Sequence, residues 1–404
     1  MPRQRNYVPQ GVIPAVLLPF HEDLSIDEAA YRAHLRDVAA VEGVSAITAN
    51  AHASEVASCS FEEQKRVLAI TADEIGDRMP IVNGVYAENA LEAARIAKMA
   101  DAGGASALLV FPSGVFSFGQ RPEMAIDHFK RIADATDLPL IAFQYPLAGG
   151  QGYPLATLTA ILDAVPTVRA IKDWCSNPQL HERHIRVLQS RVPAVNVLTT
   201  HSAWLMSSLV LGCAGLLSGS GSVIADLQAQ LWRAVQANDL AAARRLNDRI
   251  WPTAEVFYSE PWVDMHNRMK EALVLLGKLP RATVRPPLVK LSAGEIERVR
   301  RALRTPMKIS YKEIILTASI GIVVHDGTQA TAQDLVREGE IAMLRAKRSG
   351  ADRIEIFKPA MRSRKTDRLT LGSELRRAIE REEIKVLYQP IVRLEDRAIA
   401  GFEA

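Results

Sequence analysis

A regular alternation of short apolar runs with amphipathic helical segments extends from residue 11 to about residue 218, and no other feature restricts the fold as strongly. Strands that are separated by helices pair in parallel, and eight such units close into a barrel. The sequence therefore predicts an α/β protein, a (β/α)8 TIM barrel, with a C-terminal helical extension between Val223 and Leu303. The predicted strands are Val12–Leu18, Val44–Ala49, Ile81–Val85, Ala107–Phe111, Leu140–Tyr145, Val168–Asp173, Val195–Thr200 and Gly215–Ser218.

The sixth predicted strand carries Lys172 close to its C-terminal end, followed by Asp173 and Trp174. In an α/β barrel, the side chains at this end of the strands form the floor of the active site. An amine with its ordinary pKa of about 10.4 is almost fully protonated at pH 7, but apolar surroundings lower the pKa and make the amine a nucleophile. The alternative interpretation is that Lys172 marks a strand end and extends its amine into water.

Composition excludes several classes of function. The chain has 404 residues, of which 48% are hydrophobic and 24% are charged, and its net charge is +3. This balance predicts a soluble globular protein of more than one domain and gives no argument for a nucleic-acid partner. No long apolar stretch predicts a membrane span or a secretory leader, so we expect no membrane partner and a cytoplasmic location.

Three cysteines, Cys59, Cys175 and Cys213, are widely spaced along the chain. Their number and spacing suggest neither a disulfide framework nor a zinc cluster. We therefore predict no metal site and no cofactor.

Five short motifs occur in a characteristic order along the first 300 residues. Together they resemble the dihydrodipicolinate synthase and N-acetylneuraminate lyase family of class I aldolases, over residues 11 to about 303. The motifs are Gly11-Val12-Ile13-Pro14-Ala15 with Pro19-Phe20, Glu55 with Glu62-Glu63-Gln64-Lys65-Arg66, Gly103-Gly104-Ala105, Ala170-Ile171-Lys172-Asp173, and Gly212-Cys213-Ala214-Gly215.

The resemblance implies that Lys172 forms a Schiff base with a small 2-oxo acid such as pyruvate or a sugar-derived keto acid. It also implies a homo-oligomer, a tetramer in this family. We therefore expect a lyase, either an aldolase or a dehydratase, that uses no cofactor.

After the second strand the sequence departs from the family pattern. The family has two hydroxyl residues there, whereas this chain has His52 and Ala53. Backbone N–H groups around Ala51–Ala53, together with Ser218 at the end of strand eight, would still hold the substrate carboxylate. His52 is a candidate proton carrier because imidazole titrates near neutrality, and the alternative is a hydrogen-bonded structural histidine.

The fifth strand departs as well. Phe143 stands where the family carries its proton-shuttling tyrosine, and we expect it to line the substrate site instead. Tyr145 lies two residues later, and the period of a strand places it on the same side. Tyr145 is therefore the candidate replacement for the catalytic phenol, and the alternative is that it only packs.

Two further differences concern the second substrate. The synthase holds that substrate's carboxylate with an arginine after strand five, but residues 147–152 contain none. The family's paired tyrosines after strand four are replaced by Ser113-Gly114, followed by Phe116 and Phe118. We therefore expect a bulkier or partly aromatic substrate and not the lysine-biosynthetic reaction of dihydrodipicolinate synthase.

The sequence changes character near residue 304, and we expect the barrel with its helices to occupy residues 1–303. Residues 304–360 resemble the C-terminal half of a GGDEF (diguanylate cyclase) domain. Residues 361–404 contain a linker helix and resemble the truncated start of an EAL (cyclic di-GMP phosphodiesterase) domain. The GGDEF hairpin is missing, and of the EAL metal ligands only Glu403 is present. We expect neither cyclic di-GMP activity in this incomplete α/β tail.

Two other interpretations stay open at this point. The barrel is either a non-catalytic metabolite-binding module of a former cyclic di-GMP signalling protein, or it is fused to a tail that has no role.

Overall fold

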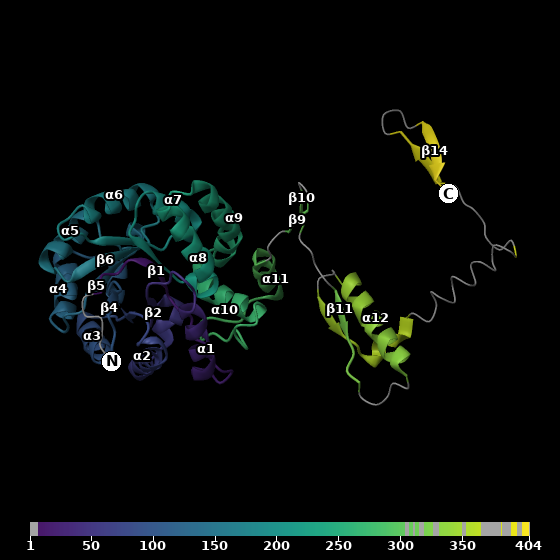
Figure 1. The fold of residues 1–404 in the computed structure, drawn as a ribbon, viewed down its shortest axis with the longest axis horizontal. Coiled ribbons are helices and arrows are strands. Elements are labelled where there is room, and N and C mark those ends of the chain that lie inside the picture. The colour runs from purple at the N-terminus through teal and green to yellow at the C-terminus, as the bar shows by residue number, and fades with distance from the viewer. Residues whose placement is uncertain are drawn as a thin grey trace. The chain divides into compact units, whose positions relative to one another are not determined.

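A computed structural model describes residues 7–303, 307–309, 312–314, 319–325, 331–349, 353–364, 381, 389–393 and 398–403. The chain divides into two units, Met1–Thr305 and Pro306–Ala404 (Figure 1). Each unit is described by itself below.

The first unit is an eight-stranded parallel barrel, as the sequence predicts. Its strands are β1 (Gly11–Pro14), β2 (Ile47–Ala49), β3 (Ile81–Val85), β4 (Ala107–Val110), β5 (Leu140–Gln144), β6 (Val168–Asp173), β7 (Asn196–Thr199) and β8 (Gly215–Ser218). The hydrogen-bonded order runs β1-β8-β7-β6-β5-β4-β3-β2. Only the isolated bridges Val12↔Val44 and Ala15↔Thr48 join β1 to β2, so this pair forms the seam of a nearly closed barrel.

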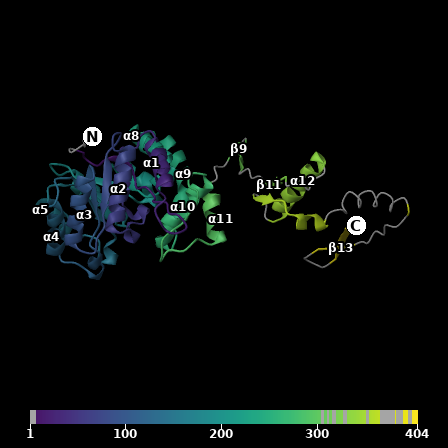
Figure 2. The ribbon, with the colours of Figure 1, turned by 90° about the horizontal axis from the view of Figure 1, so that it is seen from below.

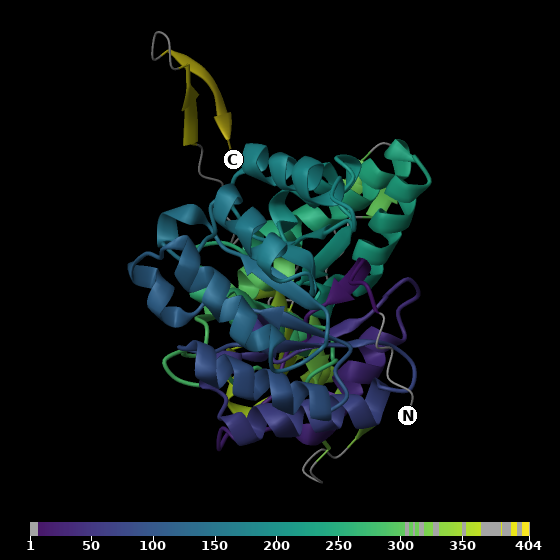
Figure 3. The ribbon, with the colours of Figure 1, turned by 90° about the vertical axis from the view of Figure 1, so that its left-hand side faces the viewer.

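Helices surround the strands on the outside, and Figure 3 shows α4 and α5 in front of the barrel. Several of these helices start at a polar residue whose side chain accepts a hydrogen bond from a backbone N–H group of the first turn. Ser60 and Glu63 form a capping box at α2, and Asn177 caps α6. The helices are α1 (Glu28–Ala39), α2 (Phe61–Ile75), α3 (Ala90–Ala102), α4 (Pro122–Ala133), α5 (Leu155–Ala164), α6 (Pro178–Gln189), α7 (Leu205–Val210) and α8 (Gly221–Gln236).

Three further helices form the predicted C-terminal extension, namely α9 (Leu240–Phe257), α10 (Met265–Leu275) and α11 (Ala293–Ala302). They gather on one side of the barrel, next to α8 (Figure 2). The central one, α10, is buried along most of its length, including charged residues. Charged side chains are rarely buried without partners, so we expect those of α10 to form ion pairs or hydrogen bonds with other segments.

The first strand is shorter than predicted. The prediction extended it to Leu18, whereas β1 ends at Pro14. Residues 15–18 are fully buried, yet their backbone makes only single bonds such as Val16 N–H to the Thr48 carbonyl. The apolar run therefore reflects burial rather than continued strand pairing.

The second unit contains short elements. They are β9 (Met307–Ile309), β10 (Lys312–Ile314), β11 (Ile320–Ile322), α12 (Ala332–Arg348), β12 (Ile354–Ile356), β13 (Gln389–Val392) and β14 (Ile399–Glu403). The sequence places the linker helix of this region at Leu371–Arg381, which lies outside the described residues except for Arg381. The predicted boundary at residue 360 stays a prediction.

The part of the chain that the structure describes has no helix with the length and apolar character that crossing a bilayer requires.

Candidate active site

Lys172 points into a cavity at the C-terminal end of the barrel. The side chain is 5% exposed, and its Nζ lies 4.0 Å from the centroid of the Phe143 ring. Phe143 is the residue that pairs with Lys172 in the register of β5 and β6. Among the described residues, no carboxylate forms an ion pair with this amine. Burial therefore lowers the pKa of Lys172 to about 7, so that about half of the amine is neutral at neutral pH.

The inner cavity has a volume of about 70 Å³. His52, Ala53 and Phe143, which the sequence predicted as site residues, all contribute to its wall. The remaining lining residues are Ala15, Lys172, Trp174, Thr200, Gly219, Tyr258, Met265 and His266.

His52 and Tyr145 meet beside the cavity. The Nε2 atom of His52 makes a short hydrogen bond with the phenol of Tyr145. Burial, and then the charge of Lys172, lower the pKa of His52 to about 3. Burial also raises the pKa of Tyr145 well above its usual value. Both groups are therefore uncharged at neutral pH, and this hydrogen bond joins them directly.

The tyrosine itself packs among aromatic rings. Its ring centroid lies 4.7 Å from that of Phe143 and 5.6 Å from that of Trp174. The two earlier interpretations of Tyr145, proton relay and packing, are thus compatible.

A second histidine, His266 on α10, was not predicted. Its ring stacks on that of His52 with centroids 6.4 Å apart and an interplanar angle of 18°. Burial lowers its pKa well below the ordinary value, and the neighbouring His52, Lys172 and Lys270 lower it further. One signal in the sequence could have marked α10 as a helix that contributes to the site. It is the run of polar residues, 266–268 and 270–271, in a segment with helical apolar spacing.

Of the predicted carboxylate-binding residues, Ala53 lines the inner cavity, whereas Ala51 and Ser218 do not. Ala51 is fully buried, and its N–H donates to the Ser54 hydroxyl at 3.3 Å. Ser218 is also buried, and its hydroxyl is 2.9 Å from that of Ser220. Gly219, the next residue, reaches the cavity wall. The carboxylate role of Ala51, Ala53 and Ser218 therefore stays a prediction.

The turn after β2 is fixed by close packing. Asn50 has a φ of 51°, and its amide donates to Asn83 at 2.8 Å. A Cβ atom at position 84 would lie 1.8 Å from the Asn50 carbonyl oxygen, so only glycine fits there. This contact holds the residues before His52 against β3.

Glu55, directly after this turn, is bound by the C-terminal extension. One carboxylate oxygen lies 2.5 Å from Lys270 Nζ on α10, and the other accepts the Arg285 backbone N–H at 3.0 Å. Lys270 also donates to the Thr283 carbonyl at 2.8 Å. The buried charges of Glu55 and Lys270 thus compensate each other.

An outer cavity of about 430 Å³ adjoins the inner one and shares four lining residues with it, namely His52, Trp174, Met265 and His266. Its other walls are largely apolar, with Trp262, Val263, Pro286, Pro287 and Leu288, and the rings of Trp174 and Trp262 are 5.7 Å apart. Phe116 and Phe118 contribute to neither cavity; the first is buried and the second is 95% exposed.

Arg285 is the cationic residue in the wall of the outer cavity, and its guanidinium is fully engaged. Its five N–H donors go to the Glu63 carboxylate and to the carbonyl oxygens of Leu24 and Ser58, at 2.6 to 3.1 Å. Among the described lining residues, none therefore offers an uncommitted cation to a second substrate's carboxylate.

Comparison with known proteins identifies the first unit. The model of the dihydrodipicolinate synthetase family matches residues 8–305. The 4-hydroxy-tetrahydrodipicolinate synthase of Thiobacillus denitrificans is 30% identical, over 73% of this chain and 96% of the relative. The enzyme of the same name from Methanoculleus marisnigri is 27% identical, over 73% of this chain and 98% of the relative.

Solved structures agree in fold. YagE, a prophage protein of the same family from E. coli K12 in complex with pyruvate, is 24% identical, covers 74% of this chain and 98% of its own, and superposes with a TM-score of 0.68. The structural likeness supports the predicted barrel.

These comparisons support some of the predictions made from the sequence and not others. They do not support the expected exclusion of the synthase reaction, because these relatives are named as that synthase. They do not favour a non-catalytic barrel either. The family match ends at residue 305, so the GGDEF-like and EAL-like resemblances of the tail have no support from it and stay predictions. The chain belongs to the dihydrodipicolinate synthetase family and, as its sequence predicts, is a Schiff-base-forming lyase of the class I aldolase type.

Proposed function

We propose that this lyase condenses Lys172 with pyruvate or a related 2-oxo acid and joins it to, or releases it from, a partner with an apolar group. The observation that carries the proposal is the amine itself, which is buried in the inner cavity, has no ion-pair partner among the described residues and has a pKa of about 7.

The chemistry follows from a neutral amine. Lys172 Nζ attacks the keto carbon of the 2-oxo acid, a C–N bond forms, and the carbonyl oxygen leaves as water. The resulting iminium accepts the electron pair of the adjacent carbon when a proton or an aldehyde departs from it. In the forward direction the enamine attacks an aldehyde carbon, the aldehyde oxygen takes a proton, and water then releases the product from Lys172.

His52 and Tyr145 are the proposed proton carriers. Both groups are uncharged near neutrality, so the phenol of Tyr145 gives its proton to an oxygen of the substrate and, as phenolate, takes a proton back in a later step. The hydrogen bond with His52 Nε2 holds the phenol in position. This arrangement would replace the tyrosine that Phe143 displaces. Backbone N–H groups at Ala51–Ala53 and the hydroxyl of Ser218 remain the proposed carboxylate site.

The nature of the partner is argued from the outer cavity. Its wall is mainly apolar and aromatic, and its one cationic residue has committed all its donors. Leaving a carboxylate there without a cation would be costly. An aromatic or otherwise apolar aldehyde fits this wall better than the carboxylated aldehyde of a lysine-biosynthetic synthase.

Imine trapping tests the first part of the proposal. The protein is treated with pyruvate and borohydride, and intact mass with peptide mapping locates the reduced adduct. We expect one adduct, on Lys172, which the Lys172→Met variant lacks. Lys98→Met, an exposed lysine on α3, is the matched control and should be modified as the wild type is. An unmodified wild type would refute the proposal and favour a barrel that only binds.

A competition between aldehydes tests the second part. Pyruvate is supplied with benzaldehyde or with succinic semialdehyde, and product is measured by mass spectrometry. We expect faster product formation with benzaldehyde. A preference for the carboxylated aldehyde would contradict the apolar partner while leaving the Schiff base intact.

A further inference from the structure

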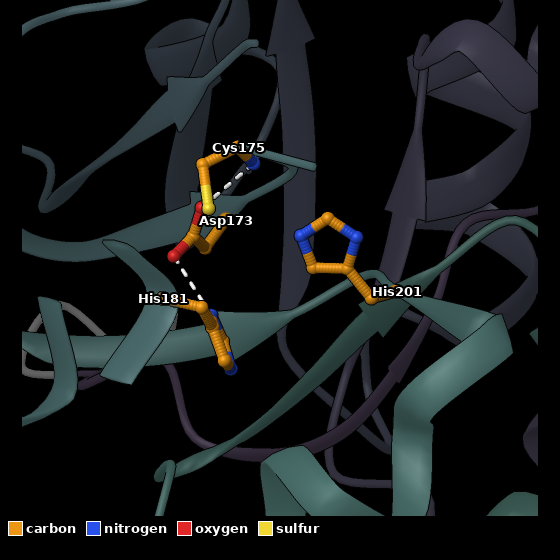
Figure 4. Close-up of side chains that lie close together, drawn as sticks. All are labelled: Asp173, Cys175, His181 and His201. Atoms are coloured by element: carbon orange, nitrogen blue, oxygen red, sulfur yellow. Dashed lines mark hydrogen bonds and ion pairs between the residues drawn. The ribbon is translucent and has the colours of Figure 1, made fainter. Parts of the chain in front are cut away.

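A cluster of metal-binding side chains lies behind β6, on the opposite side of the strand from Lys172. Asp173 is the last residue of β6, and Cys175 lies two residues later. His181 comes from α6, and His201 comes from the segment after β7 (Figure 4). All four side chains are buried. One ligand atom from each lies within 4.8 Å of the others.

Part of the cluster is already joined by hydrogen bonds. Asp173 Oδ1 accepts the backbone N–H of Cys175 at 2.9 Å. Its Oδ2 accepts from Nδ1 of His181 at 2.8 Å and from Nδ1 of His184 at 2.7 Å. Two imidazoles thus bond to one carboxylate oxygen, and no lysine or arginine is among the partners described for these three groups.

The remaining histidine is not joined to this network. His201 is 7% exposed, and its Nε2 has no hydrogen-bond partner among the described residues. In Figure 4 this ring presents its near nitrogen to the space beside Asp173 and Cys175. A buried nitrogen without a partner is unusual in a native protein and calls for a reason, such as an ion.

We propose that Asp173, Cys175, His181 and His201 bind one divalent transition-metal ion, with Zn²⁺ the best match. Thiolate, imidazole and carboxylate together are ligands that Zn²⁺ accepts in four-coordinate sites. Metal–ligand bonds of about 2.0 to 2.3 Å place tetrahedral ligands roughly 3.3 to 3.8 Å apart. Atoms that now lie within 4.8 Å of one another would therefore need to approach by up to about 1.5 Å when the ion binds.

The charge balance of binding is simple. The two imidazoles bind as neutral rings, Asp173 binds as a carboxylate, and the Cys175 thiol loses its proton to solvent. One proton is released for each ion, and no electron is transferred. Four protein ligands leave no open position, which is typical of a structural rather than a catalytic zinc site.

The ion would tie three successive segments together next to the nucleophile. Its ligands come from the end of β6, the first turns of α6 and the segment that follows β7. The expected role is to fix the end of the strand that carries Lys172. The inference does not depend on the proposed reaction.

Co²⁺ spectroscopy of the full chain tests the site. Tag-free protein is treated with a chelator, and Co²⁺ and then Zn²⁺ are titrated into it, with calorimetry in parallel. We expect one ion per chain, visible absorption bands of tetrahedral cobalt, a thiolate-to-cobalt band in the near ultraviolet, release of about one proton, and a higher Tm with Zn²⁺. Absence of stoichiometric binding and of these bands in the wild type would overturn the proposal.

Four variants separate the ion from the hydrogen-bond network. Cys175→Ser should remove the thiolate band, and His201→Gln should weaken binding by more than about 100-fold, beyond the loss typical of an outer partner. Cys213→Ser, a buried cysteine outside the cluster, should bind as the wild type does. His184→Gln keeps a donor for Asp173 and should weaken binding less than His201→Gln. Binding that survives both Cys175→Ser and His201→Gln would refute this ligand set, and circular dichroism checks that each variant folds.

Discussion

The lowered pKa of Lys172, the proposed nucleophile, results from its surroundings as a whole rather than from any single partner. The apolar wall of the inner cavity excludes water from the amine, and no described carboxylate offsets that loss of solvation. Its position at the end of a barrel strand could be predicted from the sequence, because strand ends of a barrel converge. The extent of its burial could not, since Tyr258 and Met265 reach the same cavity from segments more than 80 residues away.

The first prediction at this scale concerns the pH dependence of imine formation. With a pKa of about 7, the neutral fraction of Lys172 rises about tenfold between pH 6 and pH 8. The initial rate of borohydride-trapped adduct formation should rise by a similar factor and level off above pH 8. A rate that still rises tenfold per pH unit at pH 9 would contradict the lowered pKa.

Stability should depend on the same amine. Burial lowers the pKa of Lys172 from 10.5 to about 7 on folding, so between these values the unfolded chain binds a proton that the folded chain does not. The free energy of unfolding therefore rises with pH in this window, by roughly 3 kcal/mol between pH 7 and pH 10. Lys172→Met should lack this rise, which chemical denaturation of both proteins across the window measures.

Proton transfer is the second residue-scale question. Tyr145→Phe removes the only phenol bonded to His52 among the described residues, and we expect turnover to fall about 100-fold or more. Tyr153→Phe is the matched control, because this buried tyrosine makes no contact with His52 among the interactions described. Equal effects of the two changes would show that Tyr145 only packs.

At the scale of elements, the burial of α10 is the feature that was hardest to predict from the sequence. Its helical period was visible, but buried polar residues are recognised only when their partners are known. Those partners, Glu55 for Lys270 and Glu295 for Arg268, lie 215 and 27 residues away. The barrel strands were easier to predict because each is an apolar run followed by its own helix. The predicted bounds differ from the observed ones only at strand ends, such as Pro14 of β1 and Ile47 of β2.

A prediction follows for the Glu55–Lys270 pair. Lys270→Met leaves the Glu55 carboxylate buried without its cation, and we expect a loss of about 3–5 kcal/mol in the free energy of unfolding. The double variant Glu55→Gln/Lys270→Met should recover much of this loss. All five tryptophans lie between residues 174 and 262, so tryptophan fluorescence reports on the first unit alone. A double variant no more stable than Lys270→Met would contradict a charge effect.

At the scale of the molecule, every residue that lines the two cavities lies between Ala15 and Leu288, well within the first unit. The match to the family also ends at the boundary between the units. Both observations indicate that the chemistry belongs to the first unit. The role of residues 306–404 could not be deduced from the sequence, because their likeness to GGDEF and EAL domains rests on short motifs and the matched family model ends at residue 305.

Deletion of residues 306–404 tests this separation. We expect the shortened chain to form the pyruvate adduct at the wild-type rate and to unfold at the same Tm by tryptophan fluorescence. A changed ligand affinity or Tm would instead support the interpretation of the tail as the remnant of a signalling output.

The seam of the barrel has a consequence for catalysis. In the strand order, β6 is separated from the β1 side of the seam by β7 and β8 and from the β2 side by β5, β4 and β3, so the nucleophile stands far from the weakest pairing. Transient openings of the cylinder, which deuterium uptake by backbone amides would reveal first around residues 12–15 and 44–48, should leave the strand of the nucleophile undisturbed. The barrel can thus open locally between β1 and β2 while Lys172, the proposed nucleophile, stays in register with Phe143 on β5.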